Sequence, residues 1–254
     1  MVSGLSSQEH LGLRDDSLRS VAQTMLLLSK NTTMETRAAN SSLVAAISRP
    51  EAIGSIIREV LAHKRTLAEI ARRSYRHAAN FDEIVLIDSL DIRSYRLTLR
   101  VWDPPYTEEE IADASIHDHR FSFWHAVLVG SLTTETFTRD ASGMPFNEYQ
   151  CVPEKHGELT MGERYTLMGL TYLAAGPVSV AEPGIACYLP YHRIHRVVFP
   201  DDLACALVMR GPRQRNYTSV YNNYRPLSSY RHEMFSPAEL AEKLILVRDN
   251  LPAD

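Results

Sequence analysis

The chain has little of what would place it outside the cell or in a membrane. Its 254 residues include three cysteines, Cys151, Cys187 and Cys205, an odd number without the spacing of a disulfide framework or a zinc ribbon. The longest apolar run near the start, residues 25–28, is far too short to span a bilayer, and residues 1–16 lack the basic flank of a signal peptide. We therefore expect reduced core cysteines, a cytoplasmic protein and no membrane partner.

The chain also lacks an excess of charge of one sign. Its 27 basic and 31 acidic residues give a formal net charge of −4, and they are scattered without long blocks. Recognition of nucleic acid needs a basic patch or stripe, so we expect no nucleic-acid partner. The length suits one large domain or two small ones, and we favour one domain preceded by a helical segment.

The first eighty residues have the spacing of helices. Apolar residues recur three or four positions apart in residues 18–28 and 53–61, and Pro50 marks a helix start. Amphipathic helices of this kind are marginal on their own in water. We therefore expect residues 1–80 to form a helical segment that packs on the outside of the domain that follows.

From residue 84 the sequence changes to short β-rich runs separated by turn residues. The runs are residues 84–87, 96–102, 121–128, 132–138, 164–170, 178–180, 185–189, 194–199, 203–209 and 217–221. Many short strands are typical of a sandwich or barrel, which predicts a β domain over residues 81–235. Ser236, Pro237 and Glu239 then form the start signal of a carboxy-terminal helix, residues 236–254.

Two short stretches carry histidines in a pattern that suits a metal ion. Residues 115–121 read Ser-Ile-His-Asp-His-Arg-Phe, and side chains at i and i+2 of an extended strand point to one face, so His117 and His119 can converge. Residues 184–195 read Gly-Ile-Ala-Cys-Tyr-Leu-Pro-Tyr-His-Arg-Ile-His and supply a third imidazole. The alternative is chance, because two histidines at this spacing are common.

These stretches resemble the two motifs of the cupin superfamily. The first motif reads His-x-His, then a Glu three or four residues on, then a Gly at the end of the strand, and the second reads Gly-x5-Pro-x-Gly-x2-His. Gly130, Gly184, Pro190 and His195 fall in register with them, whereas His192 stands in place of the second motif's later Gly. The resemblance implies a double-stranded β-helix, the cupin jelly-roll barrel.

The carboxylate ligand of the first motif is missing, because Phe123 or Trp124 stands where the Glu should be. The resemblance therefore implies a metal site made of His117, His119 and His195. Three neutral imidazoles leave the ion its full charge and open coordination positions. Such a site invites an anionic or chelating substrate together with dioxygen.

Within the cupins, this replacement is a feature of the thiol dioxygenases, the cysteine dioxygenase type. Residues 96–102 and 115–137 resemble the core of that group. The chain lacks the cysteine that follows the His-x-His of cysteine dioxygenase, and Val208, Arg210 and Pro212 stand in place of its serine, histidine and tyrosine relay. We therefore do not expect cysteine itself to be the substrate.

The function that the resemblance favours is an iron(II) oxygenase that uses dioxygen to oxidise a small chelating substrate, an amino acid or a related acid. Imidazoles suit iron, copper, nickel and zinc alike, so the choice of iron depends on the resemblance. Two alternatives stay open: a lyase, isomerase or hydrolase using zinc, nickel or manganese as a Lewis acid, and a non-catalytic cupin that binds a small ligand. The resemblance also implies a homodimer paired through sheet edges, with residues 217–221 as the candidate edge.

Further residues are candidates for substrate contact. Phe123 and His125 share the strand parity of the two histidines and would line the pocket, while Trp124 would face the helices. His125 is open to being a fourth ligand, a hydrogen-bond partner of a ligand, a substrate contact or a hydrogen-bonded core residue. Arginine is the natural clamp for a carboxylate, and Arg76 lies in roughly the place from which thiol dioxygenases supply one. Tyr217 is a candidate because the next strand can bring it to the site.

Other polar residues are interpreted as solvent-facing. Four arginines flank the predicted site: Arg96, Arg100, Arg120 and Arg196. Strand parity turns Arg196 away from the metal if His195 points toward it, and solvated surface is the simpler interpretation of any single arginine. Three histidines outside the motifs are interpreted as surface residues: His77, His156 and His232.

Overall fold

The computed structural model describes residues 17–29, 33–77, 79–88, 94–112, 115–156, 159–223 and 229–253. The helices are α1 (Leu18–Leu27), α2 (Met34–Ile47), α3 (Pro50–Ala62), α4 (Lys64–Ala71), α5 (Glu108–Ala112) and α6 (Pro237–Asp249). The strands are β1 (Tyr75–Arg76), β2 (Asp82–Ile87), β3 (Arg96–Trp102), β4 (Ile116–His117), β5 (Phe121–Val129), β6 (Leu132–His156), β7 (Leu159–Ala181), β8 (Ala186–Leu189), β9 (Ile194–Val197), β10 (Ala204–Arg213), β11 (Thr218–Asn222), β12 (Ser229–Arg231) and β13 (Glu233–Met234).

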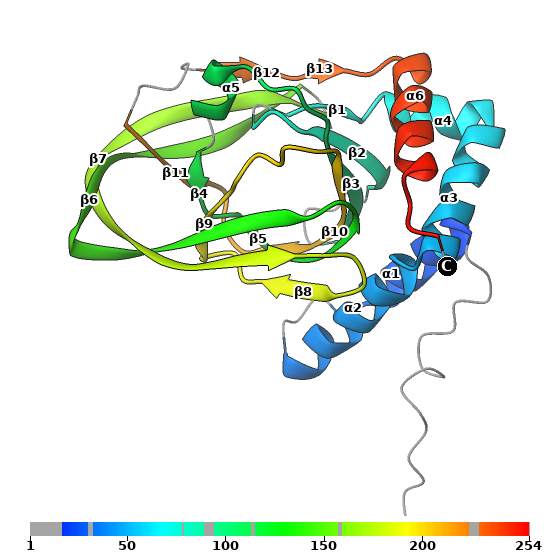
Figure 1. Cartoon of the computed structure of the whole chain (residues 1–254), viewed down its shortest axis with the longest axis horizontal. Helices are drawn as coiled ribbons and strands as arrows, with labels where there is room; N and C mark the ends of the chain where they lie inside the picture. Colours follow the sequence, from blue (N-terminus) through cyan, green and yellow to red (C-terminus); the bar gives the residue numbers. More distant parts are fainter. Residues whose placement is uncertain are drawn as a thin grey trace, which may run out of the picture.

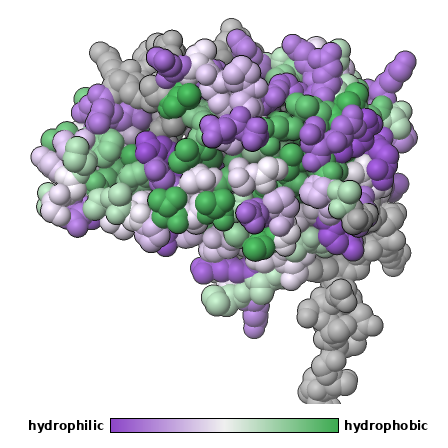
Figure 2. All heavy atoms as spheres, viewed as in Figure 1, coloured by the Kyte–Doolittle hydropathy of each residue, from purple (hydrophilic) through white to green (hydrophobic). Residues whose placement is uncertain are grey.

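The strands form two antiparallel sheets that curve around a common interior, with most helices gathered to one side (Figure 1). One sheet has the order β13-β1-β2-β3-β10-β5-β8, and the other has the order β11-β4-β9-β6-β7-β12. The prediction of a mainly β jelly-roll fold, with helices before it and one after it, is confirmed. Figure 2 shows the same face, on which apolar side chains lie among polar ones and reach the surface near the middle.

Capping residues explain where several helices begin. The Ser17 and Thr33 side chains accept hydrogen bonds from backbone N–H groups in the first turns of α1 and α2. Pro50 occupies the first turn of α3, as predicted. At α6 the backbone N–H of Ser236 donates to Glu239 Oε2 at 2.7 Å, and the Glu239 N–H donates back to Ser236 Oγ at 3.3 Å, which confirms the predicted capping box.

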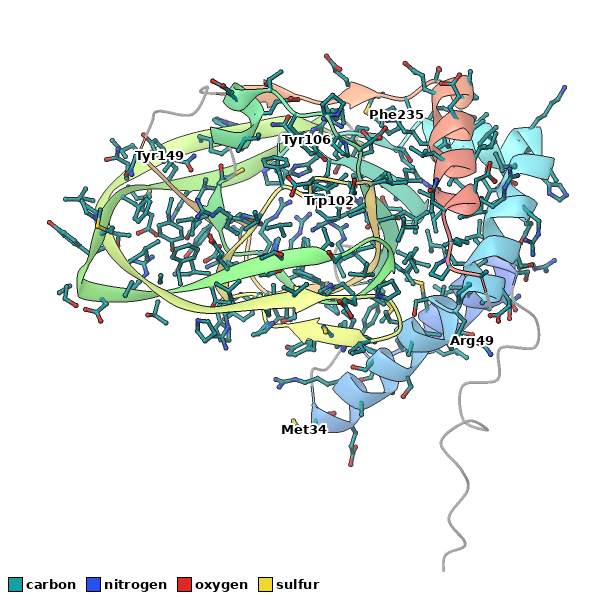
Figure 3. All side chains as sticks on the ribbon, viewed as in Figure 1. Met34, Arg49, Trp102, Tyr106, Tyr149 and Phe235 are labelled. Carbon is teal, nitrogen blue, oxygen red and sulfur yellow. The ribbon has the colours of Figure 1, made fainter. Side chains whose placement is uncertain are left out.

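The first sheet is covered on both faces, and the alternation of its residues follows from this. On β5, Trp124 and Leu128 join the cluster of side chains from the helices, whereas Phe123 and Val127 join a second cluster inside the barrel. The Trp124 indole Nε1 donates to the carbonyl oxygen of Arg37 on α2 at 3.1 Å, so the predicted outward direction of Trp124 is confirmed. Side chains fill the space between the sheets, where Trp102 lies (Figure 3). Because both faces are buried, these strands have nearly continuous apolar sequences.

β6 and β7 are much longer than predicted. The runs at 164–170 and 178–180 belong to one strand of 23 residues, and 132–138 is the start of one of 25 residues. Glycine and proline suggested breaks, but the hairpin accommodates them by shifts of register, such as the one between Glu135 and Phe137 opposite Pro177. This hairpin provides one wall of the barrel interior.

The prediction that residues 217–221 form a sheet edge is wrong, because β11 pairs with β4 on one side and with β6 on the other. β1 falls within the predicted helical segment, residues 1–80, and pairs with β2 and β13. The domain boundaries stay a prediction, and residues 1–16 lie outside the described residues.

Among the helices of the described ranges, none combines the length and the apolar character that crossing a bilayer requires.

Candidate metal centre

Strand pairing brings two of the predicted ligands face to face. His117 at the end of β4 is the direct partner of His195 on β9, and their ring centroids lie 4.7 Å apart. The His195 side chain is almost fully buried, and that of His117 is half-buried. The pairing of β4 with β9 therefore places imidazoles from two distant motifs at one point of the barrel interior.

His119 reaches the same point although it lies beyond the end of β4. Its backbone N–H donates to the carbonyl of Tyr191 at 2.8 Å, and its own carbonyl accepts from Arg215 Nε at 3.1 Å. The ring centroid of His119 lies 4.9 Å from that of His117 and 5.0 Å from that of His195. Backbone hydrogen bonds, not a regular strand, therefore fix the third imidazole.

Asp118 anchors the His-x-His segment from the opposite side. Its buried carboxylate accepts a hydrogen bond from the Ser219 backbone N–H at 2.7 Å and pairs with the Arg215 guanidinium. Burial raises the pKa of Asp118, although both of these partners act to lower it. The alternation of residues 117–119 thus turns two imidazoles inward and one anchored carboxylate away from them.

Hydrogen bonds fix which ring nitrogen carries the proton in His117 and His195. The Nδ1 atoms of His117 and His195 lie 2.9 Å from the carbonyl oxygens of Ser115 and Arg193, so each Nδ1 carries the proton and donates it. The Nε2 atom of each of these two rings therefore carries the lone pair that can coordinate a metal. His119 Nε2 is buried without a hydrogen-bond partner among the described residues. One ligand atom from each ring lies within 4.8 Å of the others, so the three residues fit a metal ion.

The surroundings keep the imidazoles of His119 and His195 neutral. Burial, reinforced by the neighbouring His117, lowers the pKa of His119 and of His195 well below the ordinary value. Arg100 acts in the same direction on both rings. A metal ligand must be the neutral form of histidine, so the electrostatics agree with the geometry.

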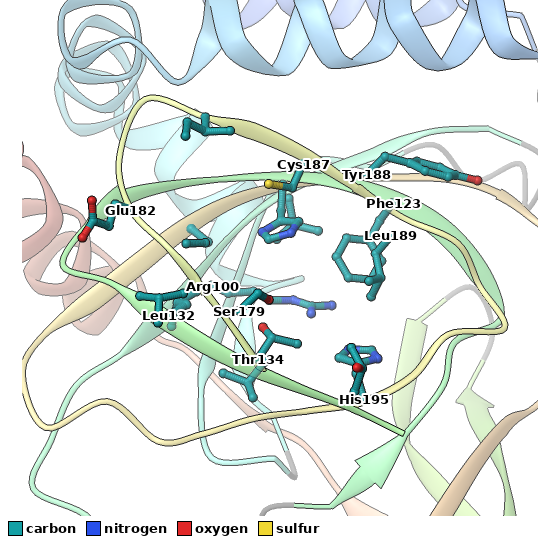
Figure 4. A pocket seen from close by; sticks show the side chains of 18 of the residues that line it. Arg100, Phe123, Leu132, Thr134, Ser179, Glu182, Cys187, Tyr188, Leu189 and His195 are labelled. Atoms are coloured by element: carbon teal, nitrogen blue, oxygen red, sulfur yellow. The ribbon is translucent and has the colours of Figure 1, made fainter. Parts of the chain in front are cut away.

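The larger of the two cavities that adjoin the histidines, of about 340 Å³, is lined by His117 and His195 and is called the main cavity of the site. His117, His195 and Arg100 supply cationic or coordinating groups, and Figure 4 shows Arg100, Phe123 and His195 pointing toward its middle from different sides. Most of the other lining is apolar: Trp102, Phe123, Leu132, Val180, Ala181, Ile185, Leu189, Val197, Ala206 and Val208. Two of these side chains, Val180 and Ile185, are 61% and 66% exposed, which places them at the mouth.

A smaller cavity, of about 110 Å³, adjoins the histidines from another direction. His117 and Arg100 line both cavities, whereas His119 and Arg120 line the smaller one alone. His77 also lines it, with its ring stacked 4.5 Å from that of Phe81. The histidine group therefore separates a large apolar chamber from a small chamber with two arginines.

The predicted pocket residues of β5 lie where strand parity indicates. Phe123 lines the main cavity, with its ring centroid 4.9 Å from that of His119 in an edge-on arrangement. His125 lines the same cavity, opposite Cys187 of β8, but is not part of the three-histidine group. Burial lowers the pKa of His125 to about 4. His125 is therefore not part of the metal-ligand group, and its contact with substrate stays a prediction.

The structure does not bring Arg76 or Tyr217 to either cavity. The Arg76 guanidinium is held by two carboxylates, with Nη1 3.3 Å from Asp82 Oδ1 and Nη2 3.6 Å from Glu110 Oε1. The Tyr217 ring lies beneath the guanidinium of Arg215, 4.6 Å from it. Neither position supports the predicted substrate contact, because each side chain is turned toward other partners.

Arg100 is the site residue that the sequence interpretation undervalued. On β3, Leu97, Leu99 and Val101 face the helices, so Arg100 faces the barrel interior. Its Nε donates to Glu83 Oε2 at 2.9 Å, and its guanidinium lies 4.9 Å from the ring of Phe81. Burial acts to raise the pKa of Glu83, but the positive charge of Arg100, together with His77 and Arg96, makes the net shift downward. The signal was a charged residue on β3 at a position opposite in parity to the apolar residues Leu97, Leu99 and Val101.

The surface assignment of the remaining histidines was wrong for one of them. The His232 side chain is buried and stacks on Tyr75 with ring centroids 4.0 Å apart. His77 is half-buried in the wall of the smaller cavity. The side chain of His156 lies outside the described residues. In agreement with its predicted direction, Arg196 lies outside both cavities and pairs with Glu135, with its Nε 2.7 Å from Oε2.

Comparison with known proteins gives only distant similarities. No protein-family model matches the chain, and no curated protein matches it. Among solved structures, hydroxypropylphosphonic acid epoxidase from S. wedmorenis in complex with fosfomycin matches at 10% identity and a TM-score of 0.32, covering 55% of each chain. A hydroquinone 1,2-dioxygenase in complex with Cd2+ and 4-hydroxybenzonitrile matches at 18% identity and a TM-score of 0.31, covering 57% of this chain and 69% of that one. A DMSP lyase structure matches at 14% identity and a TM-score of 0.27, covering 52% and 47%. Similarities at these TM-scores do not indicate a function, so the evidence for function comes from the site itself.

Proposed function

We propose that the chain is a mononuclear non-haem iron(II) oxygenase that uses dioxygen to oxidise a small chelating acid. The observation that carries the proposal is the group formed by His117, His119 and His195, whose ligand atoms lie within 4.8 Å of one another. No carboxylate or thiol of the described residues belongs to this group. The choice of iron over other divalent metals follows the resemblance to the cupins that lack a carboxylate ligand, since imidazole alone selects weakly.

The three histidines would hold the metal through their unprotonated nitrogens. When bound, an iron(II) ion with three protein ligands supplies redox chemistry toward dioxygen and free coordination positions for a chelating substrate. The protein's own contribution is to orient the rings and to keep His119 and His195 neutral through burial. The carbonyls of Ser115 and Arg193 orient His117 and His195 by accepting the Nδ1–H hydrogen bonds.

The lining of the main cavity supports a narrower proposal for the substrate class. Arg100 presents a permanent positive charge beside His117 and His195, which suits a carboxylate. Thr134 and Ser179, direct partners across the β6–β7 pairing, add hydroxyl groups to the wall. The remaining wall is mainly apolar and excludes water around the substrate body. We therefore propose an amino acid or related acid with an apolar side chain.

His125 completes the cavity as an uncharged hydrogen-bonding group. With its pKa near 4, the ring stays neutral at physiological pH. A neutral imidazole can donate through one nitrogen and accept through the other. His125 therefore helps to orient a polar group of the substrate, while Arg100 remains the group that binds the substrate carboxylate.

The proposal is tested by metal analysis and oxygen uptake on one preparation. The protein is loaded anaerobically with iron(II), freed of excess metal, and mixed with apolar amino acids, their 2-hydroxy and 2-oxo analogues, and small thiols. We expect one iron per chain and oxygen uptake that depends on one class of acid. Tight zinc, nickel or manganese with turnover that consumes no oxygen would replace the oxygenase by a non-redox metalloenzyme. Binding without any turnover would replace it by a non-catalytic ligand-binding protein.

A further inference from the structure

A cluster of arginines lies at one end of the first sheet, next to the candidate metal centre. Arg96 on β3 and Arg210 on β10 are direct partners, and Arg213 is paired with Phe121 on β5, the neighbour of Arg120. The Arg210 guanidinium lies 5.1 Å from the Phe121 ring. Three adjacent strands thus bring four guanidinium groups to one end of the barrel.

The carboxylate of Asp88 forms ion pairs with two members of this cluster, Arg96 and Arg210. Arg96 binds it through two hydrogen bonds, Nε to Oδ1 at 2.7 Å and Nη2 to Oδ2 at 2.5 Å, while Arg210 Nη2 stays 3.9 Å from Oδ1. The next carboxylate inward, that of Glu83, is already engaged by Arg100. The charges of the described residues therefore leave the cluster strongly positive.

Arg120 is the member with the clearest need of a partner. Its Nε and Nη1 atoms are buried and have no hydrogen-bond partner among the described residues. The backbone is fixed, because the Arg120 carbonyl accepts from the N–H groups of Gln214 and Arg215 at 2.7 and 3.3 Å. A buried guanidinium donor without an acceptor is costly, so such a donor indicates a site for an acceptor from outside the chain.

Arg210 and Arg213 also experience the excess of positive charge. Burial, followed by the charge of Arg96, lowers the pKa of Arg210 to about 9, and burial with Arg120 and Arg96 lowers the pKa of Arg213. The side chains of Arg96 and Arg210 remain 15% and 18% exposed, so a small ligand can reach them from solvent. Two or more planar guanidinium groups around one point match the oxygen atoms of a phosphate or carboxylate group.

We propose that Arg96, Arg120, Arg210 and Arg213 form a binding site for a small oxyanion that carries two or more negative charges. Phosphate esters and polycarboxylates share this chemistry, and the experiment below distinguishes them. The site is separate from the three-histidine group and does not require the metal. Because Arg120 follows His119 directly and lines the smaller cavity beside it, the bound anion lies next to the metal centre.

The test uses the full chain, stripped of metal, so that it is independent of the proposed oxygenase activity. Inorganic phosphate, pyrophosphate and succinate are titrated by calorimetry and by thermal unfolding at constant ionic strength, with chloride as the reference. We expect saturable binding and a higher unfolding temperature with at least one of the three anions. Preference for phosphate and pyrophosphate would identify a phosphate-type ligand, and preference for succinate a polycarboxylate.

Two variants locate the site. Arg120→Gln and Arg210→Gln should each weaken anion binding by about tenfold or more, because a charge-assisted hydrogen bond contributes about 1.5–3 kcal/mol. Arg120→Lys should weaken anion binding to an intermediate extent, because lysine keeps the positive charge but lacks the two parallel N–H donors of the guanidinium. The matched control is Arg65→Gln on α4, whose side chain is 93% exposed. A folded Arg120→Gln protein that loses the response to anions would support the site. An absence of saturable binding to the native chain, or equal weakening by Arg65→Gln, would overturn it.

Discussion

His117 and His195 are direct partners across the β4–β9 pairing, with ring centroids 4.7 Å apart. Each ring is oriented by a backbone carbonyl two residues before it, Ser115 in one case and Arg193 in the other. The same local hydrogen bond, from a histidine Nδ1–H to the carbonyl of residue i−2, thus occurs twice and orients both rings toward one point. The site is pre-organised by local backbone geometry that does not depend on a metal.

The first prediction compares two histidines in the second motif. His195→Ala should abolish retention of iron(II) and leave the fold intact, because the barrel has its own apolar clusters. His192→Ala, in the exposed turn between β8 and β9, should retain the metal. Metal content after gel filtration, with circular dichroism as the check on folding, gives the answer. Full metal content in His195→Ala would refute the assigned ligand set.

A second prediction separates the structural role of Arg100 from its proposed role in substrate binding. Arg100→Gln leaves the buried Glu83 carboxylate unpaired, so we expect a loss of about 3 kcal/mol in the free energy of unfolding. Adding Glu83→Gln should restore most of that stability, because both charges are then absent. Substrate affinity, measured by calorimetry on the iron-loaded protein, should stay low in both variants. Recovery of affinity in the double variant would show that Arg100 acts on stability alone.

The third prediction concerns acid stability and His125. Its folded pKa of about 4 lies below the unfolded value near 6.5, so the unfolded state takes up a proton first as pH falls. The contribution of His125 is present above pH 6.5 and is lost between pH 6.5 and 4, by about 3 kcal/mol in total. Metal-free wild type and His125→Gln should therefore differ in urea-unfolding stability in a pH-dependent way. A difference that stays constant across this range would show that His125 is not buried in its neutral form.

The alternation of strand residues accounts for most of what the sequence predicted correctly. Parity placed Phe123 and His125 in the cavity and Trp124 against the helices, because β5 is buried on both faces and each face has a distinct environment. The same rule applied to β3 would have selected Arg100. The resemblance to the thiol dioxygenases selected Arg76 instead, but Arg76 forms ion pairs with Asp82 and Glu110, which no local sequence pattern connects to it.

The features that the sequence did not predict depend on contacts between residues far apart in the chain. The position of His119 depends on a hydrogen bond to Tyr191, 72 residues later in the chain, and β11 is enclosed because β6 extends far beyond its predicted end. The arginine cluster likewise assembles from β3, β5 and β10 only after the sheet forms. Sequence periodicity reports which face a residue occupies but not which distant residue shares that face.

The last prediction tests the apolar character of the substrate at the mouth of the main cavity. Ile185 lines that cavity and is 66% exposed, so Ile185→Asp should change stability little. An acid with an apolar side chain would meet a carboxylate where it now meets the sec-butyl group of Ile185, and its affinity should fall by about tenfold or more. Ile111→Asp on α5, which is 52% exposed and outside both cavities, is the control. Calorimetry with the substrate found by oxygen uptake measures both variants. Equal affinity in the two would mean that the substrate does not pass or contact this apolar rim, and the substrate class would then have to be sought among smaller, fully polar acids that bind at Arg100 alone.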